Sequence, residues 1–386
     1  DEPFMKDLVW LDNLKLRVGY GKTGNSAVSP YQTKGQLALR HYVFNNGSSE
    51  YIGYAPSVMA NDQLTWETTD QWNVGVDFGF LKNRINGTVE FYLQNTKDLL
   101  LKRQLPVVSG FSSVMSNVGS TRNKGIEITL NTRNIMNRNF TWSTDLTFSA
   151  NKEEIVELYN GKTDDVGNLW FIGQPIDVYY NYKKIGIWQN TENDLAEMAK
   201  FNEKGANFKP GSIRLEDVDG DYKITEEDKQ ILGSVRPKFV ASMVNNFEFK
   251  GFDLSVFLYA SVGGLLRNNI EFMEKPGRGN TVKVDYWTPT NPTNAFPRPS
   301  VDVEKLDYIS TLGYDKADFL RIRNITLGYT LPEMWSKKVL MDKIRIYLSA
   351  NNPAIFTNFT GIDPEGANGR TAPSYSTWMF GINLSM

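Results

Sequence analysis

Cysteine is absent from the 386 residues of this chain, and there is a single histidine, His41. These two facts exclude Cys/His metal centres, cysteine nucleophiles and any serine–histidine dyad that does not use His41. A chain without cysteine cannot depend on disulfide bonds, so its composition fits an envelope protein. The sequence contains no other constellation of catalytic residues, and we do not expect an enzyme.

Long hydrophobic runs and a strong net charge are also missing. No run reaches 18 apolar residues, which excludes a transmembrane helix, so any membrane role must come from strands. The 42 Lys and Arg against 44 Asp and Glu give a net charge of −2, and no broad basic field is available for nucleic acid. Aromatic residues are plentiful at 13%, which favours amphipathic rings at a boundary.

Apolar and polar residues alternate with a period of two in many segments of the chain. This period predicts β-strands, and four pairs of such segments are close enough to form hairpins. The last stretch, YSTWMFGINLSM, follows the same pattern, with Trp378, Phe380, Ile382, Leu384 and Met386 on one parity. With residues 14–20 and 381–386, we expect about ten long strands. The predicted hairpins pair 72–80 with 85–94, 126–131 with 140–149, 238–249 with 252–262, and 319–331 with 343–352.

The connections between these strands alternate between short turns and long polar segments, the longest at 152–237. Long strands with short turns at one end and long loops at the other are typical of a transmembrane antiparallel β-barrel, with apolar residues toward lipid and polar residues toward a lumen. A soluble β-sandwich also alternates, but its strands and loops are shorter. Because a barrel closes its last strand on its first, a terminal strand fits this fold.

Other residues extend the barrel prediction. Aromatic residues at strand ends fit the interfacial girdles of such barrels. The inward polar residues are expected to line the lumen or to pair with Arg323 and Arg345. The aromatic set is Trp66, Trp72, Trp142, Tyr329, Trp335 and Trp378, and the inward acidic set is Asp77, Glu90, Glu127 and Asp145.

Several stretches, in this order, resemble the C-terminal part of SusC/RagA-type TonB-dependent transporters. They are LKLRVGYGKTGN (14–25), LTWETTDQWNVGVDFGFLKNRINGTVEFYLQNTKDLLL (64–101), NVGSTRNKGIEITLNTR (117–133), PGSIRLEDVDGDYKITEEDKQILGSVRPKF (210–239) and FEFKGFDLSVFLYAS (247–261). The resemblance covers nearly the whole of residues 1–386.

The resemblance implies a barrel of 22 strands in the outer membrane of a Gram-negative, Bacteroidetes-like bacterium, of which this chain supplies about ten. It further implies a plug and N-terminal strands elsewhere, energy from a TonB complex, import of a glycan or oligopeptide, and a SusD-like surface lipoprotein as partner. Asp1-Glu2-Pro3 is no signal peptide, so we expect a processed or partial product. One departure is Met386 at the end, where such barrels commonly carry Phe.

The stretch DVDGDYKITEED, residues 217–228, has the ligand spacing of a calcium loop. Oxygen donors at positions 1, 3, 5, 7, 9 and 12 suit this hard cation. Tyr222 replaces the usual glycine at position 6, with Gly220 nearby, and an acidic solvated loop is the alternative. The predicted ligands, for a calcium ion of structural role, are Asp217, Asp219, Asp221, the carbonyl of Lys223, Thr225 and Asp228.

Aromatic residues in the predicted long loops are candidates for stacking on sugar rings, chiefly Trp170, Trp188 and Trp287. Packing within their own loops is the alternative for each of them. The main competing interpretation of the whole chain is a calcium-stabilised β-rich surface adhesin, or a carbohydrate-binding module, without transport. Such a protein would be monodisperse without detergent.

Overall fold

The computed structural model describes residues 8–386 apart from 27–29, 32, 48, 112, 269–283, 300–305 and 367–373. In this part of the chain, ten long strands form one sheet in the order β1-β4-β5-β8-β9-β14-β15-β18-β19-β20, as predicted. The four predicted hairpins are β4–β5, β8–β9, β14–β15 and β18–β19. The strands are β1 (Leu11–Asn25), β4 (Glu67–Phe80), β5 (Ile85–Lys97), β8 (Ser120–Met136), β9 (Phe140–Glu157), β14 (Phe239–Phe249), β15 (Phe252–Val262), β18 (Phe319–Thr330), β19 (Lys343–Thr357) and β20 (Thr377–Ser385).

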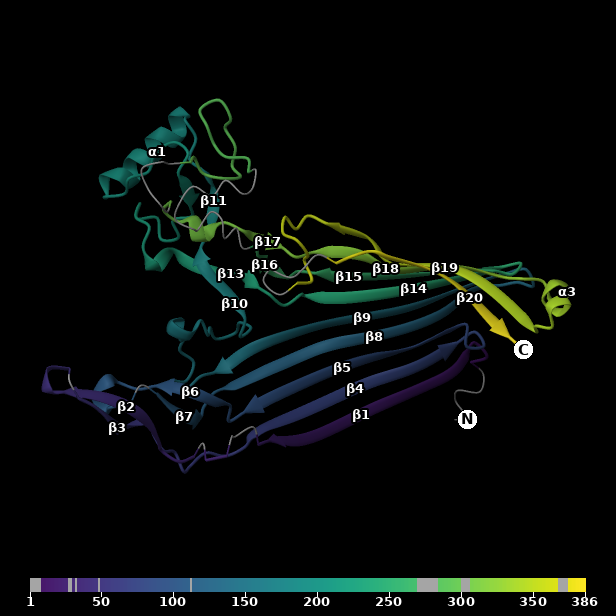
Figure 1. The fold of residues 1–386 in the computed structure, drawn as a ribbon, viewed down its shortest axis with the longest axis horizontal. Helices are drawn as coiled ribbons and strands as arrows, with labels where there is room; N and C mark the ends of the chain where they lie inside the picture. The colour runs from purple at the N-terminus through teal and green to yellow at the C-terminus, as the bar shows by residue number, and fades with distance from the viewer. Residues whose placement is uncertain are drawn as a thin grey trace. The chain divides into compact units, whose positions relative to one another are not determined.

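The chain divides into two compact units. Unit 1 comprises residues 1–136 and 142–176, and unit 2 comprises 137–141 and 177–386. Unit 1 carries β1, β4, β5, β8 and most of β9, and unit 2 carries the other five long strands (Figure 1). The strand registers and side-chain contacts are therefore described for each unit separately.

In unit 1 the register places residues of like polarity side by side across the strands. Leu16 of β1 pairs with Val76 of β4, which pairs with Val89 of β5, and Val89 pairs with Ile128 of β8. The next residue of β1, Arg17, lies on the opposite face. Its row there continues through Gly75 of β4 to Glu90 of β5. The two parities therefore give the sheet one apolar and one polar face.

Unit 1 also has two small hairpins inside segments that the sequence indicated only as long loops. β2 (Gln36–Phe44) pairs with β3 (Ser49–Val58), and β6 (Leu100–Gln104) pairs with β7 (Ser113–Asn117).

In unit 2 the same face pattern recurs. Leu327 of β18 pairs with Leu348 of β19, which pairs with Phe380 of β20. The turn of the β14–β15 hairpin is only Lys250 and Gly251, both at positive φ, a conformation that suits the glycine but is uncommon for lysine. The turn between β18 and β19 is longer and contains the short helix α3 (Glu333–Ser336).

Three long segments of unit 2 fold together into a lobe, defined here as residues 177–234, 284–299 and 306–316. It contains a helix and short strands that gather at the end of β14, β15 and β18 opposite α3 (Figure 1). Helix α1 begins after Thr191, whose side chain accepts a hydrogen bond from the Asp194 N–H. The elements are α1 (Glu192–Glu203), β10 (Val178–Tyr182), β11 (Lys184–Ile187), β12 (Ile213–Leu215), β13 (Lys229–Ser234) and β17 (Tyr314–Lys316), which pairs with β16 (Leu265–Arg267).

The lobe, and not the sheet, holds the main hydrophobic cores of the described residues. One core is built around Ile187, Trp287 and Leu312, and a second around Trp188, Phe201 and Phe208. Burial of each such side chain contributes about 1.5–3 kcal/mol to the free energy of folding. The lobe thus has the internal packing of a folded body, although its sequence is polar and rich in turn residues.

The apolar face of the sheet remains uncovered in the described residues. Its side chains are exposed on strands of both units, and no buried hydrophobic cluster of the described residues includes the apolar face of long strands. A β-sandwich would bury these side chains between two layers. No helix in the described part of the chain is long and apolar enough to cross a membrane. The exposed apolar set is Leu14, Leu16, Val18, Trp72, Val74, Phe91, Leu327, Leu348, Trp378, Phe380, Ile382 and Leu384.

Candidate functional site

The polar face of unit 1 carries an ion-pair row across three strands. Arg17 donates to Asp77 through Nε and Nη2, both at 3.0 Å, and its Nη1 lies 3.7 Å from Glu90 Oε1. Thr88 donates to the same Asp77 carboxylate at 3.0 Å. Gly75 lies beneath, where a Cβ would come within 2.8 Å of Arg17 Nη2. The missing side chain leaves room for the guanidinium to lie along the sheet.

Unit 2 repeats this arrangement on its own polar face. Arg345 of β19 binds both carboxylate oxygens of Asp253 on β15, with Nε at 2.9 Å from Oδ1. The pair crosses over Gly328 of the intervening strand, where a Cβ would lie 2.5 Å from both partners. The bidentate geometry fixes the two side chains relative to the strands.

These contacts correct the predicted pairing of the inward acids. Asp77 and Glu90 do not pair with Arg323 or Arg345 but with Arg17. Asp145 instead accepts from the side chain of Asn131 at 2.7 Å. Pairs between adjacent strands were missed because alternation identifies a face without identifying the register.

A second charged network holds the segment after β19 against β18. Arg321, 2% exposed, donates to Asp363 at 2.7 Å, and its Nε lies 3.0 Å from Glu365 Oε2. Arg323 also binds Glu365, and Ser374 donates to Asp363. Burial raises the pKa of Asp363. The hydrogen bonds from Ser374, the Glu365 N–H and Arg321 lower that pKa by more, so the net shift of the pKa is downward.

The predicted calcium loop places three of its acids together. Carboxylate oxygens of Asp217, Asp219 and Asp221 all lie within 4.8 Å of one another. Asp217 accepts from the Gly220 N–H and the Tyr222 N–H, both at 2.9 Å, which wraps the backbone around its carboxylate. The donor set consists of hard oxygen atoms, as Ca²⁺ prefers.

Charge crowding is evident at Asp219. The hydrogen bond from the Asp221 N–H lowers the pKa of Asp219, but desolvation by the surrounding loop and the neighbouring charges of Asp221 and Asp228 raise it more, so the net direction is upward. A divalent cation among these oxygens would remove that repulsion. These residues therefore fit a calcium ion.

Asp228 is 1% exposed and is not one of the three acids whose carboxylate oxygens lie within 4.8 Å of one another. Its two oxygens accept from the Val218 N–H at 2.8 Å and the Thr225 N–H at 2.7 Å, so it closes the loop. Thr225 caps the short turn Glu226–Asp228 in a reciprocal capping box. Each oxygen of Asp228 retains a lone pair for a cation.

Tyr222 explains how the loop turns without glycine at its sixth position. Its φ of 62° lies in the left-handed region, as does the φ of 76° at Gly220. The cost of this conformation is about 1–2 kcal/mol. The Tyr222 ring packs edge-on against Phe201 at 5.5 Å and lies under Lys200 Nζ, so the second core of the lobe holds it in place.

The other end of the loop is attached to β10. Tyr182 donates to Glu226 at 3.3 Å, and Lys229 Nζ lies 2.7 Å from the same carboxylate. Burial, with the nearby charge of Glu226, raises the pKa of Tyr182 to about 12. The hydroxyl therefore stays protonated and keeps donating.

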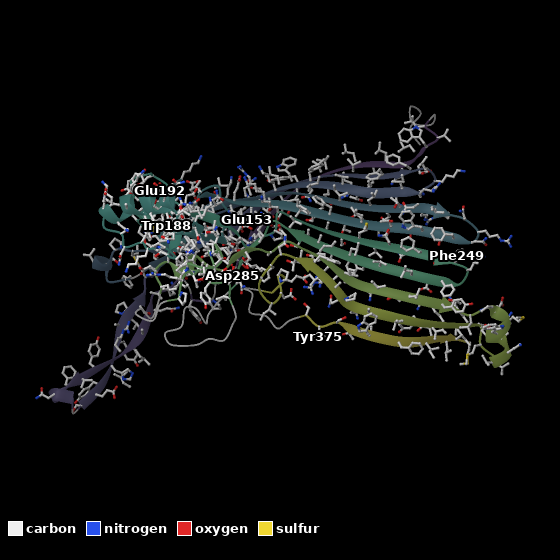
Figure 2. All side chains as sticks on the ribbon, turned by 90° about the horizontal axis from the view of Figure 1, so that it is seen from above. Glu153, Trp188, Glu192, Phe249, Asp285 and Tyr375 are labelled. Atoms are coloured by element: carbon white, nitrogen blue, oxygen red, sulfur yellow. The ribbon has the colours of Figure 1, made fainter. Side chains whose placement is uncertain are left out.

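The three tryptophans proposed for sugar stacking differ in exposure. Trp188 is 1% exposed, with Arg214 over its ring at 4.4 Å, and Trp287 is 5% exposed and donates to Gln189. Trp170 belongs to unit 1 and is half-buried. Figure 2 shows Trp188 and Asp285 at the lobe end, away from Phe249 at the turn end. A stacking role stays a prediction for all three, and burial argues against it for Trp188 and Trp287.

Comparison with known proteins assigns this geometry to a family. The family model described as "TonB dependent receptor-like, beta-barrel" matches residues 7–353. The chain therefore belongs to the TonB-dependent receptor-like β-barrel family. The predicted fold class, an antiparallel β-barrel of this family, is confirmed.

Individual relatives narrow the likeness to the SusC/RagA type. TonB-dependent receptor P3 of Formosa agariphila is 32% identical over 99% of this chain and 40% of the relative. TonB-dependent receptor SusC of Bacteroides thetaiotaomicron is 31% identical over the whole chain and 38% of the relative. A structure of the RagAB peptide transporter superposes with a TM-score of 0.77 at 25% identity, over 99% of this chain and 42% of that one. The chain thus spans about two fifths of the length of these proteins.

Proposed function

We propose that this chain is part of the barrel wall of a SusC-like TonB-dependent transporter in the outer membrane of a Bacteroidetes-like bacterium. The observation that carries the proposal is the division of the sheet into two faces. In each unit one face exposes apolar side chains and the other carries an ion pair, Arg17–Asp77 in unit 1 and Asp253–Arg345 in unit 2. Lipid on one side and an aqueous lumen on the other account for both faces.

The proposed activity is import of a glycan or an oligopeptide, energised by a TonB complex and assisted by a SusD-like surface lipoprotein. The likeness to SusC and to the RagAB peptide transporter supports this class of activity. The remaining barrel strands and the plug lie in the rest of the transporter. No catalytic role is proposed.

The test uses the full-length protein in its native host. We expect it in the outer-membrane fraction, with heat-modifiable mobility on a denaturing gel, and we expect deletion to abolish growth on one class of polymer supplied alone. Parallel cultures on oligosaccharides and on oligopeptides separate the two substrate classes, and deletion of the gene for a SusD-like lipoprotein tests the partner. Recovery as a monodisperse soluble protein without detergent would favour the adhesin or binding-module alternative.

We also propose that residues 217–228 bind a structural calcium ion. The clustered oxygens of Asp217, Asp219 and Asp221 and the repulsion at Asp219 support this. The ion would fix the loop against the second core of the lobe through Tyr222 and take no part in transport.

Terbium luminescence is a direct probe of this site, because Tyr222 lies within the loop and sensitises a bound lanthanide. We expect terbium luminescence that decreases when calcium displaces the terbium. We expect no luminescence in the double variant Asp219→Asn/Asp221→Asn. Asp285→Asn is the matched control, since Asp285 is an exposed acid of the same lobe held by Thr293 and Asn291. Luminescence that persists in the double variant would refute the site.

A further inference from the structure

The turn between β18 and β19 differs from the other turns at its end of unit 2. Those turns are residues 137–139 and 250–251, whereas this one runs from 331 to 342. It contains α3 and a following 3-10 turn, Lys337–Val339. Its large apolar side chains point into solvent, at 68% exposed for Met334, 54% for Trp335, 57% for Val339 and 89% for Leu340.

This turn is a folded element. Ser336 is completely buried, and its hydroxyl lies 3.2 Å from the carbonyl oxygens of Glu333 and Asp342. The Met341 N–H donates to the Ser336 carbonyl, and the Asp342 N–H donates to the Ser385 carbonyl of β20 at 2.8 Å. The backbone therefore holds the four apolar side chains outward in fixed positions.

Contacts among the described residues do not account for the conformation of Leu340. Its φ of 60° lies in the left-handed region, which costs a non-glycine residue about 1–2 kcal/mol. Its side chain, 89% exposed, gains no compensating burial in the described structure. Glycine or asparagine would suit the backbone better, so a leucine here points to a contact outside the chain.

The charges around the turn identify the chemistry of that contact. Lys337 and Lys338 are exposed beside the four apolar side chains, and Lys337 Nζ also lies 2.5 Å from Glu333 Oε1 in a pair that remains open to solvent. Arg138, Lys250 and Lys343 lie in or next to the turns at the same end of unit 2. Apolar and aromatic side chains next to several cations are typical of a segment lying in a membrane interface with anionic headgroups.

The turn also continues the apolar face of unit 2. Leu331 N–H donates to the Ile344 carbonyl, Ile344 pairs with Leu384, and Leu384 is exposed on β20. Under the proposed function, this face contacts the acyl chains. The exposed side chains of the turn then lie where that face ends, at the level of the headgroups.

We propose that residues 332–341 form an interfacial anchor that binds anionic phospholipid. Trp335, Leu340 and their apolar neighbours enter the boundary of the acyl chains, while Lys337 and Lys338 contact phosphate groups. The inference rests on the proposed function, because it requires the apolar face of the sheet to be in a bilayer. A polypeptide covering the same side chains is the competing occupant.

Because this chain has no cysteine, it brings no competing thiol to site-specific labelling. Three variants of the full-length protein are labelled with a polarity-sensitive fluorophore, namely Leu340→Cys, Leu348→Cys and, as the control at the lobe end, Asp285→Cys. Each is reconstituted into vesicles of phosphatidylcholine alone or with phosphatidylglycerol, containing spin-labelled lipid as quencher. We expect a headgroup-level quencher to act on position 340, an acyl-chain quencher to act on position 348, and neither to act on position 285.

The lysines give the lipid specificity. We expect stronger quenching at position 340 in vesicles with phosphatidylglycerol than in vesicles of phosphatidylcholine alone. We expect Lys337→Gln and Lys338→Gln each to reduce this preference for phosphatidylglycerol about fivefold. Equal quenching in both lipids, or no quenching at position 340 while position 348 is quenched, would overturn the anchor and leave the barrel intact. Absence of quenching at position 348 would instead refute the proposed function.

Discussion

Arg17 of β1 binds Asp77 of β4 through two hydrogen bonds of 3.0 Å, directly above a glycine that leaves room for the guanidinium. The pair joins adjacent strands on the polar face. Its counterpart in unit 2, Arg345 with Asp253, spans two strands over Gly328. In both units, therefore, an arginine and an aspartate of the polar face pair with each other within the sheet.

A double-mutant cycle measures the Arg17–Asp77 pair. Both side chains are partly exposed, so solvent screens the interaction, and we expect a small favourable coupling free energy. The four proteins are the parent, Arg17→Ala, Asp77→Ala and the double variant, compared by denaturant unfolding in detergent. Zero coupling would show that Arg17 interacts equally well with Glu90 when Asp77 is removed.

The two faces of β4 should respond oppositely to a new charge. Val76→Arg puts a cation on the apolar face and is expected to lower the free energy of unfolding in a bilayer by about 2–4 kcal/mol. Asn73→Arg is the matched control on the polar face, where Glu90 lies 3.2 Å from the Asn73 amide nitrogen. We expect little loss there. Equal losses in the two variants would contradict the assignment of the faces.

The strands were predictable because one period governs each of them. Alternation along Trp72–Phe80 and Ile85–Leu93 identified a hairpin whose register pairs Val76 with Val89. The same signal located the last strand, β20, and its exposed parity. Period two is imposed by the backbone itself, so it is visible without knowledge of the neighbours.

The lobe was not predictable to the same degree, because its cores join segments far apart in the chain. Trp287 and Ile187 share a core although a hundred residues separate them. Helix α1 did leave a local signal, namely Thr191 as cap and Met198 and Phe201 on one face. Asp217, Asp219 and Asp221 lie together as their spacing suggested, while Asp228 accepts hydrogen bonds from the Val218 and Thr225 N–H groups of the same loop.

Trp188 is predicted to be essential to the packing of the lobe. Its ring lies against Phe201 and Phe208, and its buried Nε1 has no acceptor among the described residues. Trp188→Ala should therefore destabilise the lobe by about 3–5 kcal/mol. Hydrogen exchange of the α1 amides reports this directly.

Trp188→Phe is the matched control for that measurement. It keeps an aromatic ring in the core and removes the unpaired N–H, so we expect a much smaller loss. If both variants exchange like the parent while glycan binding is lost, Trp188 would be a ligand contact.

The network of Arg321, Asp363 and Glu365 should make the segment after β19 sensitive to acid. The pKa of Asp363 is lowered in the folded protein, so its contribution to stability is present above the ordinary Asp pKa of about 3.9 and is lost as pH falls below it. We expect protease cleavage within residues 358–366 by an acid-active protease to accelerate as pH falls below about 3.9, the ordinary Asp pKa. Protonation removes the charge that Arg321 binds at 2.7 Å.

Two variants test the assignment of this acid effect. Asp363→Asn removes the titrating group, so cleavage should be fast at neutral pH and no longer change with pH in that range. Arg321→Met leaves Asp363 buried without its main cation, and we expect a loss of about 3–5 kcal/mol in the free energy of unfolding. An acid response that persists unchanged in Asp363→Asn would assign it to another carboxylate, with Glu365, which also binds Arg323, as the next to replace.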